Sequence, residues 1–176
     1  MNTSSATVLS TEPLNFEELF RAHFTFACRT LRRLGVQERD LGDVAQELFL
    51  AVHGQLDAWD RKRPVKPWLA GFCLRFASNY RQLARHRGTS LNDVMAASTH
   101  DRHDDSIAAR QAVLRILEGL EFDQRTALVL HDMEGLTAVE IAELTSAPLP
   151  TVYSRVRLAR ERARKILASL EEGGAS

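Results

Sequence analysis

The chain has few cysteines, no long apolar run and no net charge, and each absence excludes a class of protein. Its two cysteines, Cys28 and Cys73, form no C-x-x-C pair, which favours reduced, buried thiols in a cytoplasmic protein over a disulfide framework. No apolar run approaches the roughly 18 residues that a membrane-spanning helix needs. The N-terminus lacks the basic start and apolar core of a secretory signal, so residues 1–14 are expected to form a disordered tail.

The absence of net charge conceals an uneven distribution, because 23 basic and 23 acidic side chains are sorted along the sequence. The segment from Arg61 to Arg87 holds eight basic residues and no acidic one, and residues 89–106 hold four acidic residues against one basic. A second basic cluster lies between Arg155 and Lys165. Two basic patches separated by an acidic segment indicate a polyanionic partner.

Apolar residues recur at spacings of three and four almost throughout, and no alternating β-branched run occurs, so the sequence predicts an all-α fold. Gly35 should end the first helix and Asp40 should cap the second. The expected helices cover Asn15–Leu34, Asp40 to about Leu56, Lys66 or Pro67 to about His86, Ile107–Gly119, Asp123–Met133, Ala138–Leu144 and about Pro150–Leu170.

The polar, acidic stretch 89–106 lacks helical periodicity and is expected to be a flexible linker between two small helical domains, 15–88 and 107–171, with a short tail at 172–176. Its HDRHDD run (His100–Asp105) has the residue types of a metal site. A flexible segment does not fix ligand geometry, so no metal site is expected there.

A helix-turn-helix is the most specific local pattern in the second half. Thr137 and Glu140 have the spacing of a capping box, and Leu136 and Ile141 that of a hydrophobic staple. A turn at Thr145–Pro148 then leads into a longer helix. This is the arrangement of a DNA-binding helix-turn-helix, although a solvated amphipathic helix closing a bundle would share part of the pattern.

The longer helix has a polar side suited to DNA. Val152 and Val156 fall on one side of it, while Ser154 and Arg157 point the opposite way. Arginine near the N-terminal end of such a helix can donate to two acceptors of guanine in the major groove. The remaining arginines would mainly meet phosphates.

Three stretches together resemble bacterial extracytoplasmic-function (ECF, group IV, sigma-70 superfamily) sigma factors, from about Phe16 to Leu170. They are DLGDVAQELFLAVHGQLDAWD, PWLAGFCLRFASNYRQLARHR and PLPTVYSRVRLARERAR, in that order. The resemblance implies a sigma region 2 bundle and a sigma region 4 helix-turn-helix. It implies a factor that binds core RNA polymerase, through the β′ clamp helices and β flap, and directs transcription initiation at specific promoters.

The resemblance also assigns residues to three surfaces. The residues implied to bind core polymerase are Asp40, Asp43, Gln46, Glu47 and Phe49. The residues expected to meet the −10 element are Arg61, Lys62, Arg63, Lys66, Asn79, Arg81 and Arg85, whereas the aromatic residues Trp68, Phe72, Phe76 and Tyr80 are interpreted mostly as packing. The residues expected to meet the −35 element are Thr151, Tyr153, Ser154, Arg155, Arg157 and Arg160.

Two positions depart from the family pattern, and other features bear on regulation. Tyr153 and Leu158 stand where basic residues are common, so the preferred base sequence is expected to differ. No fused sensor module is expected, which would imply regulation by an anti-sigma partner. The acidic linker is hypothesised to weaken DNA binding by the free protein.

The sequence leaves three alternatives open. A stand-alone helix-turn-helix regulator fits the second half but does not explain residues 40–60, and a polymerase-binding anti-sigma or adaptor would bind the enzyme without directing it to a promoter. An enzyme is not expected, because the sequence has no HExxH pair, glycine-rich phosphate loop or nucleophile elbow. His131 and Asp132 are interpreted as a helix-surface pair, and no cofactor is implied.

Overall fold

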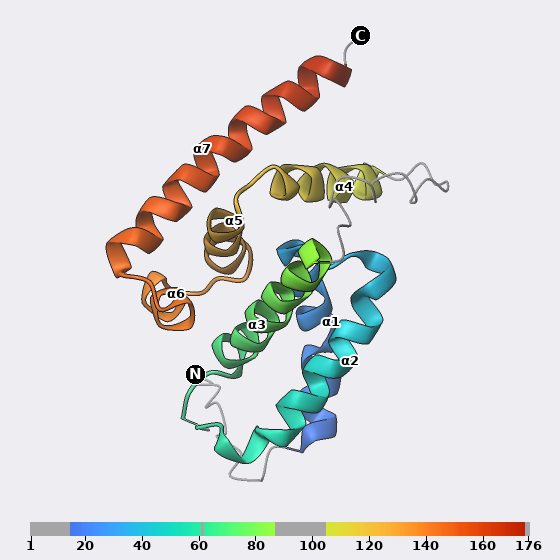
Figure 1. Ribbon diagram of the computed structural model, residues 1–176, viewed down its shortest axis with the longest axis vertical. Helices are drawn as coiled ribbons and strands as arrows, with labels where there is room; N and C mark the ends of the chain where they lie inside the picture. The colour runs from blue at the N-terminus through green and yellow to red at the C-terminus, as the bar shows by residue number, and fades with distance from the viewer. Residues whose placement is uncertain (1–14, 61, 87–104, 175–176) are drawn as a thin grey trace, which may run out of the picture.

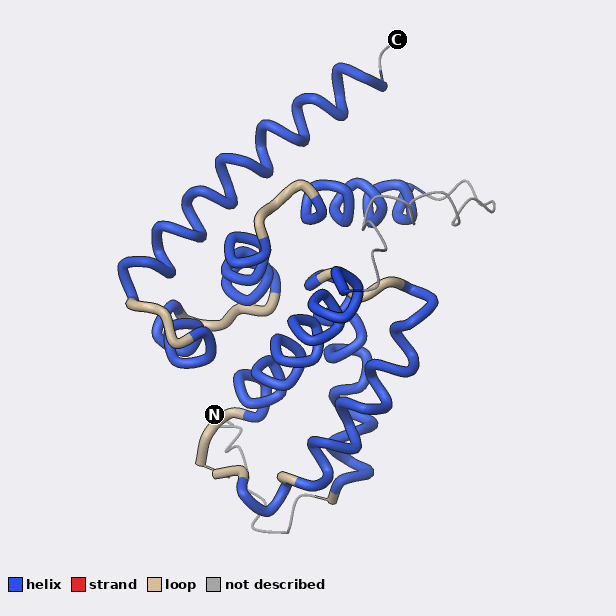
Figure 2. The backbone as a smooth tube through the Cα atoms, viewed as in Figure 1, coloured by secondary structure: helices blue, strands red, loops and turns tan. Residues whose placement is uncertain are grey.

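The computed structural model describes residues 15–60, 62–86 and 105–174, most of which are helical. No strand occurs within these ranges, in agreement with the predicted all-α fold. Figure 1 shows the order of the elements and Figure 2 the short loops that join them. The elements are α1 (Phe16–Leu34), α2 (Glu38–Gly54), the 3-10 turn η1 (Leu56–Ala58), α3 (Val65–His86), α4 (Asp105–Glu118), α5 (Phe122–Leu128), the π-helical turn η2 (Val129–Met133), α6 (Ala138–Thr145) and α7 (Leu149–Gly174).

Both ends of α1 are where the sequence predicts them. The side chain of Asn15 accepts a 3.1 Å hydrogen bond from the backbone N–H of Glu17, which satisfies one free amide of the first turn. Gly35 ends the helix with φ of 109°, and its N–H donates to the carbonyl of Arg32. This left-handed conformation favours glycine, because a Cβ would crowd the backbone there.

The predicted start of α2 is wrong. The helix begins at Glu38, and the capping position belongs to Gln37, whose backbone is extended. Asp40 therefore lies inside the first turn, where a carboxylate still interacts favourably with the positive end of the helix dipole. Its side chain accepts a 2.6 Å hydrogen bond from the hydroxyl of Tyr80, which joins α2 to α3.

The apolar faces of α1, α2 and α3 form the N-terminal bundle. Phe72 is buried in its core, and the other three residues of the predicted aromatic stripe, Trp68, Phe76 and Tyr80, are partly buried and pack against it. The interpretation of this stripe as packing is confirmed. Cys73 is fully buried, and burial raises the pKa of its thiol. Cys28 is only half-buried, contrary to expectation.

The C-terminal half contains the predicted helix-turn-helix in α6 and α7. The Thr137 hydroxyl accepts a hydrogen bond from the backbone N–H of Glu140, and the Glu140 carboxylate accepts one from the backbone N–H of Thr137, so the capping box is confirmed. Ser146, in the left-handed region with φ of 51°, ends α6. The buried face of α7, which includes Val152 and Ala159, then packs on α5 and α6.

The predicted linker lies largely outside the described residues. Asp105 and Ser106, the last two residues assigned to it, instead form the first turn of α4. Most of the HDRHDD run also lies outside the described ranges, and no cluster of potential metal ligands occurs within them. Of the helices described, none combines the length and apolar character needed to cross a membrane.

The two halves pack against each other. α1 contacts α4, α5 and η2, and buried residues of both halves belong to one hydrophobic cluster. In Figure 1, α5 and α6 face the α3 side of the N-terminal bundle, while α7 runs along the outer side of the C-terminal half. This arrangement determines which of the candidate functional residues face solvent.

Candidate nucleic-acid interface

The outer face of α2 carries three of the residues expected to bind polymerase. Asp43, Gln46 and Glu47 are exposed, on the side opposite the buried Ala45 and Leu48. Gln46 and Glu47 follow Asp43 by three and four positions, and residues at these spacings lie on the same side of a helix. This side is an accessible polar surface with two carboxyl groups and one amide.

Phe49 and Asp40, the other two residues assigned to this surface, have structural contacts instead. Phe49 is 2% exposed, and its ring centroid lies 4.8 Å from that of Phe20 and 5.8 Å from that of Phe24. The exposed apolar residue on this side of α2 is Leu50, with 66% of its surface accessible. Leu50 lies seven positions after Asp43 and three after Glu47, on the same side of the helix, but it was not among the residues that the family motif assigns to this surface.

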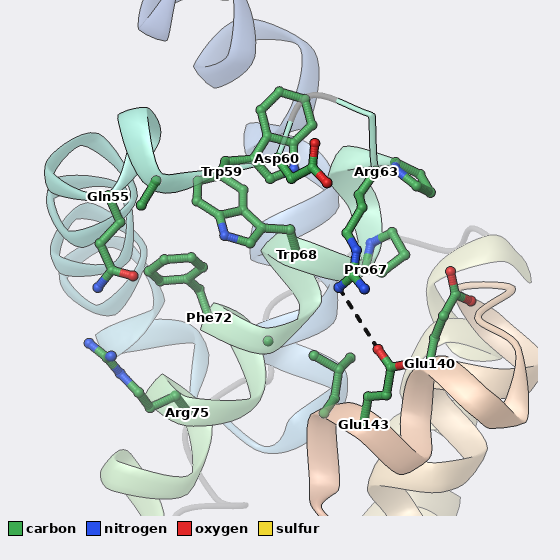
Figure 3. A pocket seen from close by; sticks show the side chains of 14 residues that line it. Gln55, Trp59, Asp60, Arg63, Pro67, Trp68, Phe72, Arg75, Glu140 and Glu143 are labelled. Atoms are coloured by element: carbon green, nitrogen blue, oxygen red, sulfur yellow. Dashed lines mark ion pairs between the residues drawn. The ribbon is translucent and has the colours of Figure 1, made fainter.

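The basic loop before α3 borders a cleft between the two halves of the chain. Lys62, Arg63 and Lys66 are exposed, whereas Arg61 lies outside the described residues. The cleft, with a volume of about 760 Å³, is lined on the α3 side by Trp59, Trp68, Phe72, Arg63 and Arg75 and on the α6 side by Glu140, Glu143 and Leu144 (Figure 3). A guanidinium nitrogen of Arg63 lies 4.0 Å from a carboxylate oxygen of Glu143.

Two of the three candidate residues farther along α3, Asn79 and Arg81, lie beside α5. Asn79 lines a second hollow together with Phe122 and Arg155. The guanidinium of Arg81 lies 4.4 Å from the centroid of the Phe122 ring, a cation–π geometry. Burial, followed by repulsion from Arg85, lowers the pKa of Arg81, while Arg85 itself is exposed. No pattern in the sequence indicates that Phe122 would contact Arg81.

The candidate residues of α7 differ in exposure and in whether they form ion pairs. Ser154 is exposed and Tyr153 is 58% exposed, so both offer an open surface. Arg157 is also exposed and forms a helix-surface pair with Glu161 at 2.7 Å. Arg155 instead forms an ion pair with Asp123, which joins α7 to the first turn of α5. Thr151, next to the buried Val152, is half-buried.

Arg160 is likewise engaged in a contact between elements. Its Nε and Nη2 atoms donate to the two carboxylate oxygens of Asp132 at 2.8 and 2.6 Å. These hydrogen bonds are the main cause of the lowered pKa of Asp132, and the hydrogen bond from His131 adds to it. The expected pair of His131 and Asp132 is present, with Nδ1 and Oδ1 2.7 Å apart.

Comparison with known proteins identifies the family. The family described as sigma-70, region 4 matches residues 110–162. The ECF RNA polymerase sigma-E factor of Escherichia coli (strain K12) is 31% identical over 140 residues, covering 72% of this chain and 73% of that protein. The protein of the same name from Haemophilus influenzae is 29% identical over 140 residues, covering 72% and 74%. This chain belongs to the ECF sigma factor family.

The fold of this ECF sigma factor is shared with two solved structures. One is a sigma factor named RpoE, in complex with the anti-sigma factor NepR from Bartonella quintana. It is 21% identical, with a TM-score of 0.71, and the match covers 87% of this chain and 96% of that one. The other is CnrH in complex with the cytosolic domain of CnrY, at 23% identity, a TM-score of 0.66 and 88% coverage of both chains.

An ion-pair cluster around one buried carboxylate joins the two halves of this sigma factor. The Glu134 carboxylate, after η2, accepts hydrogen bonds from Arg29 at 3.1 Å and from Arg33 at 2.8 Å, both in α1. The side chain of Glu134 is 1% exposed. Arg125 in α5, also buried, donates from Nε to the backbone carbonyl of Arg33. The two ion pairs of Glu134 join residues about a hundred positions apart, so no local pattern in the sequence indicates them.

Proposed function

We propose that this ECF sigma factor binds core RNA polymerase and directs it to promoters by recognising two DNA elements with two domains. The N-terminal bundle binds the polymerase and the −10 element, the C-terminal half from α4 onward binds the −35 element, and the segment before Asp105 connects them. The observation that carries this proposal is the basic loop at Lys62 and Arg63, which borders a cleft lined by aromatic side chains. Basic side chains beside aromatic ones suit a separated DNA strand.

The polymerase-binding surface is the exposed face of α2. Asp43, Gln46 and Glu47 supply its polar contacts to the β′ clamp helices, and Leu50 supplies an apolar contact beside them. Phe49 acts from beneath, because its packing against α1 holds this part of the helix in place. The C-terminal half meets the β flap.

The −10 surface comprises the loop before α3 and the α3 face that follows it. Lys62, Arg63 and Lys66 contact the backbone of the non-template strand, while the cleft accepts an unstacked base. Asn79, Arg81 and Arg85 extend this surface along α3. Arg61 belongs to the same basic run in the sequence.

The −35 surface is the exposed side of α7. Ser154, Tyr153 and Arg157 contact base edges or the backbone in the major groove, with Thr151 at the edge of this surface. Arg155 and Arg160 act by positioning α7, because each is bonded to a carboxylate of a preceding element. This division refines the set of six residues that the sequence analysis proposed.

An anti-sigma factor controls this activity. Support comes from the two solved structures of the same fold, each of which has a bound partner: NepR, named as an anti-sigma factor, or the cytosolic domain of CnrY. The protein acts in the cytoplasm, where its polymerase is, and contributes binding and positioning rather than a catalytic step of its own.

The test is run-off transcription with purified bacterial core polymerase on a pool of promoter fragments, with and without this protein. We expect promoter-dependent transcripts that are lost when Gln46→Ala and Glu47→Ala are combined. The matched control combines Gln111→Ala with Glu171→Ala, two exposed residues of the same types that lie outside α2 and outside the residues assigned to DNA. Transcripts that persist in the Gln46 and Glu47 variant would remove α2 from the polymerase interface.

A stand-alone helix-turn-helix regulator remains the second candidate for the same α6–α7 geometry. It predicts tight binding to a palindromic duplex without polymerase, together with no transcripts in the run-off assay. The exposed, conspicuously polar face of α2 favours the sigma-factor proposal over this candidate, because a regulator of that kind has no use for it.

A further inference from the structure

We infer that α7 selects an A·T pair in the −35 element through Tyr153, whose ring contacts the C5-methyl group of thymine in the major groove. This inference rests on the proposed function, since it uses the assignment of α7 to the −35 element. It deepens that assignment by naming the base pair and the side chain that reads it.

Tyr153 lies near the N-terminal end of α7, which begins at Leu149. In a helix-turn-helix, the N-terminal residues of the second helix are the ones that contact base edges. Tyr153 is 58% exposed, and Leu149, four positions earlier on the same side of the helix, is 37% exposed. α7 runs along the outer side of the C-terminal half, where a duplex can approach it (Figure 1). This end of the helix therefore presents an apolar surface to the groove.

Two of the three arginines among the −35 candidates are held by other elements. Arg155 is paired with Asp123 in the first turn of α5. Arg160 donates to both carboxylate oxygens of Asp132, at 2.8 and 2.6 Å. A guanidinium whose donors are used in this way is poorly placed to reach the N7 and O6 acceptors of guanine. Tyr153 therefore has no such arginine competing for the bases beside it.

Arg157 is the third of these arginines, and it can still reach DNA. Its partner, Glu161, lies in the same helix, and the two side chains are 64% and 47% exposed. Exposed pairs of this kind contribute little free energy, so a phosphate or a guanine can replace Glu161. Polar contacts with the element are then made by Arg157 and by the exposed Ser154, which leaves the apolar contact to Tyr153.

Thymine is the base that an exposed aromatic ring can distinguish from the other three. In the major groove it alone carries a methyl group, and apolar side chains that contact this group favour A·T pairs. Guanine and cytosine present only hydrogen-bonding groups there, and a ring placed against them would remove their water without replacing its hydrogen bonds. A tyrosine ring can meet the methyl group while its hydroxyl stays in contact with water or a phosphate.

The first experiment selects binding sites from a promoter library in which the −35 element is randomised. The protein is the full chain assembled with bacterial core polymerase, and the library is built on a promoter from the run-off pool. Wild type is compared with Tyr153→Phe, Tyr153→Arg and Leu167→Ala. Leu167 is the matched control, because it is another exposed apolar residue of α7 and lies in its C-terminal part, outside the residues assigned to DNA.

We expect wild type, Tyr153→Phe and Leu167→Ala to enrich the same A·T pair at one position. Tyr153→Arg should enrich a G·C pair at that position and leave the others unchanged, because arginine can donate to two acceptors of guanine. The inference is overturned if no position changes in Tyr153→Arg, or if the position that changes is a G·C pair in wild type. Loss of the preference in Tyr153→Phe would also overturn it, since the hydroxyl would then be the reader.

The second experiment removes only the methyl group. Thymine at the enriched position is replaced by deoxyuridine, which pairs with adenine in the same way but lacks the C5-methyl group. The affinity of the wild-type holoenzyme for the promoter should fall roughly four-fold, the effect of one buried methyl-sized group. Tyr153→Ala should bind the two DNAs equally. Equal binding by wild type, or the same loss in Tyr153→Ala, would contradict the methyl contact.

Run-off transcription with wild-type protein separates this inference from the proposed function. If wild-type protein supports promoter-dependent transcription but no base preference depends on Tyr153, the inference fails and the sigma-factor proposal stands. If wild-type protein supports no transcription, the proposed function fails, and the selection is repeated with the full chain alone. The same change of preference in Tyr153→Arg would then support the role of Tyr153 in a stand-alone regulator, whereas no enriched A·T pair would overturn it.

Discussion

The hydroxyl of Tyr80 in α3 donates a 2.6 Å hydrogen bond to the carboxylate of Asp40 in the first turn of α2. Burial, together with this bond to a carboxylate, raises the pKa of Tyr80 to about 12. Asp40 was assigned to the polymerase surface from its place in a family motif. Its contact indicates a second role, because it joins two helices of the bundle.

Tyr80→Phe should lower the free energy of unfolding by about 1 kcal/mol, since one charge-assisted hydrogen bond is lost and Asp40 can partly rehydrate. The folded protein holds the Tyr80 proton to a higher pH than the unfolded chain, so this stabilisation is present below about pH 10 and declines towards pH 12. Urea unfolding across this range should give wild-type and Tyr80→Phe curves that converge. A constant difference would contradict the assignment.

Arg155→Gln and Asp123→Asn should have the same effect on transcription, because each breaks the ion pair that joins α7 to α5. Both should reduce −35-dependent run-off transcription, while changing the free energy of unfolding by about 1 kcal/mol or less. Asp123→Asn is the decisive variant. It removes a negative charge, which by itself would strengthen DNA binding, so an increase in transcription would refute the positioning role. Glu171→Gln is the control for the charge change.

Asp132 should make the protein more resistant to acid. Because the hydrogen bonds from Arg160 lower the pKa of Asp132, its stabilising contribution is present above its ordinary pKa near 3.8 and is lost as the pH falls further. Arg160→Gln should therefore unfold at a higher pH than wild type in an acid titration followed by circular dichroism. Arg162→Gln, an exposed neighbour, should leave the midpoint unchanged.

Phe49 and Leu50 are adjacent residues with opposite expected effects. Phe49→Ala should lower the free energy of unfolding by about 3 kcal/mol or more, because it leaves a cavity among the rings of α1. Leu50→Gln should change stability by less than about 0.5 kcal/mol, since Leu50 is exposed. It should reduce run-off transcription roughly ten-fold if it contributes a central contact to polymerase. Unaltered transcription would exclude Leu50 from that interface.

The sequence predicted local structure well where the deciding interactions are local. The helix ends at Asn15 and Gly35 and the capping box at Thr137 depend on residues within three positions of one another, so their patterns are visible in the chain. Asp40 was predicted wrongly because Gln37 provides the extended residue before α2, and an acidic side chain suits either position.

The candidate site was less predictable because its partners come from distant segments. Spacing alone could not show that Arg155 meets Asp123, or that Glu134 meets Arg29 and Arg33. A family motif locates a surface, but it does not say which members of the motif are buried, as Phe49 illustrates. Helical periodicity identified the inner and outer faces of α2 and α7. Which of the outer side chains are paired or covered depends on packing between distant segments, which periodicity does not show.

The side chains at the π-helical turn η2 and directly after it point toward two different helices. Asp132, inside this turn, reaches Arg160 of α7, whereas Glu134, directly after it, reaches Arg29 and Arg33 of α1. In a regular α-helix each residue advances by about 100°, so removing one residue here would rotate everything that follows by that angle. The extra residue of the π turn therefore determines the directions in which the following side chains point. As a result, one short segment contacts both α7, through Asp132, and α1, through Glu134.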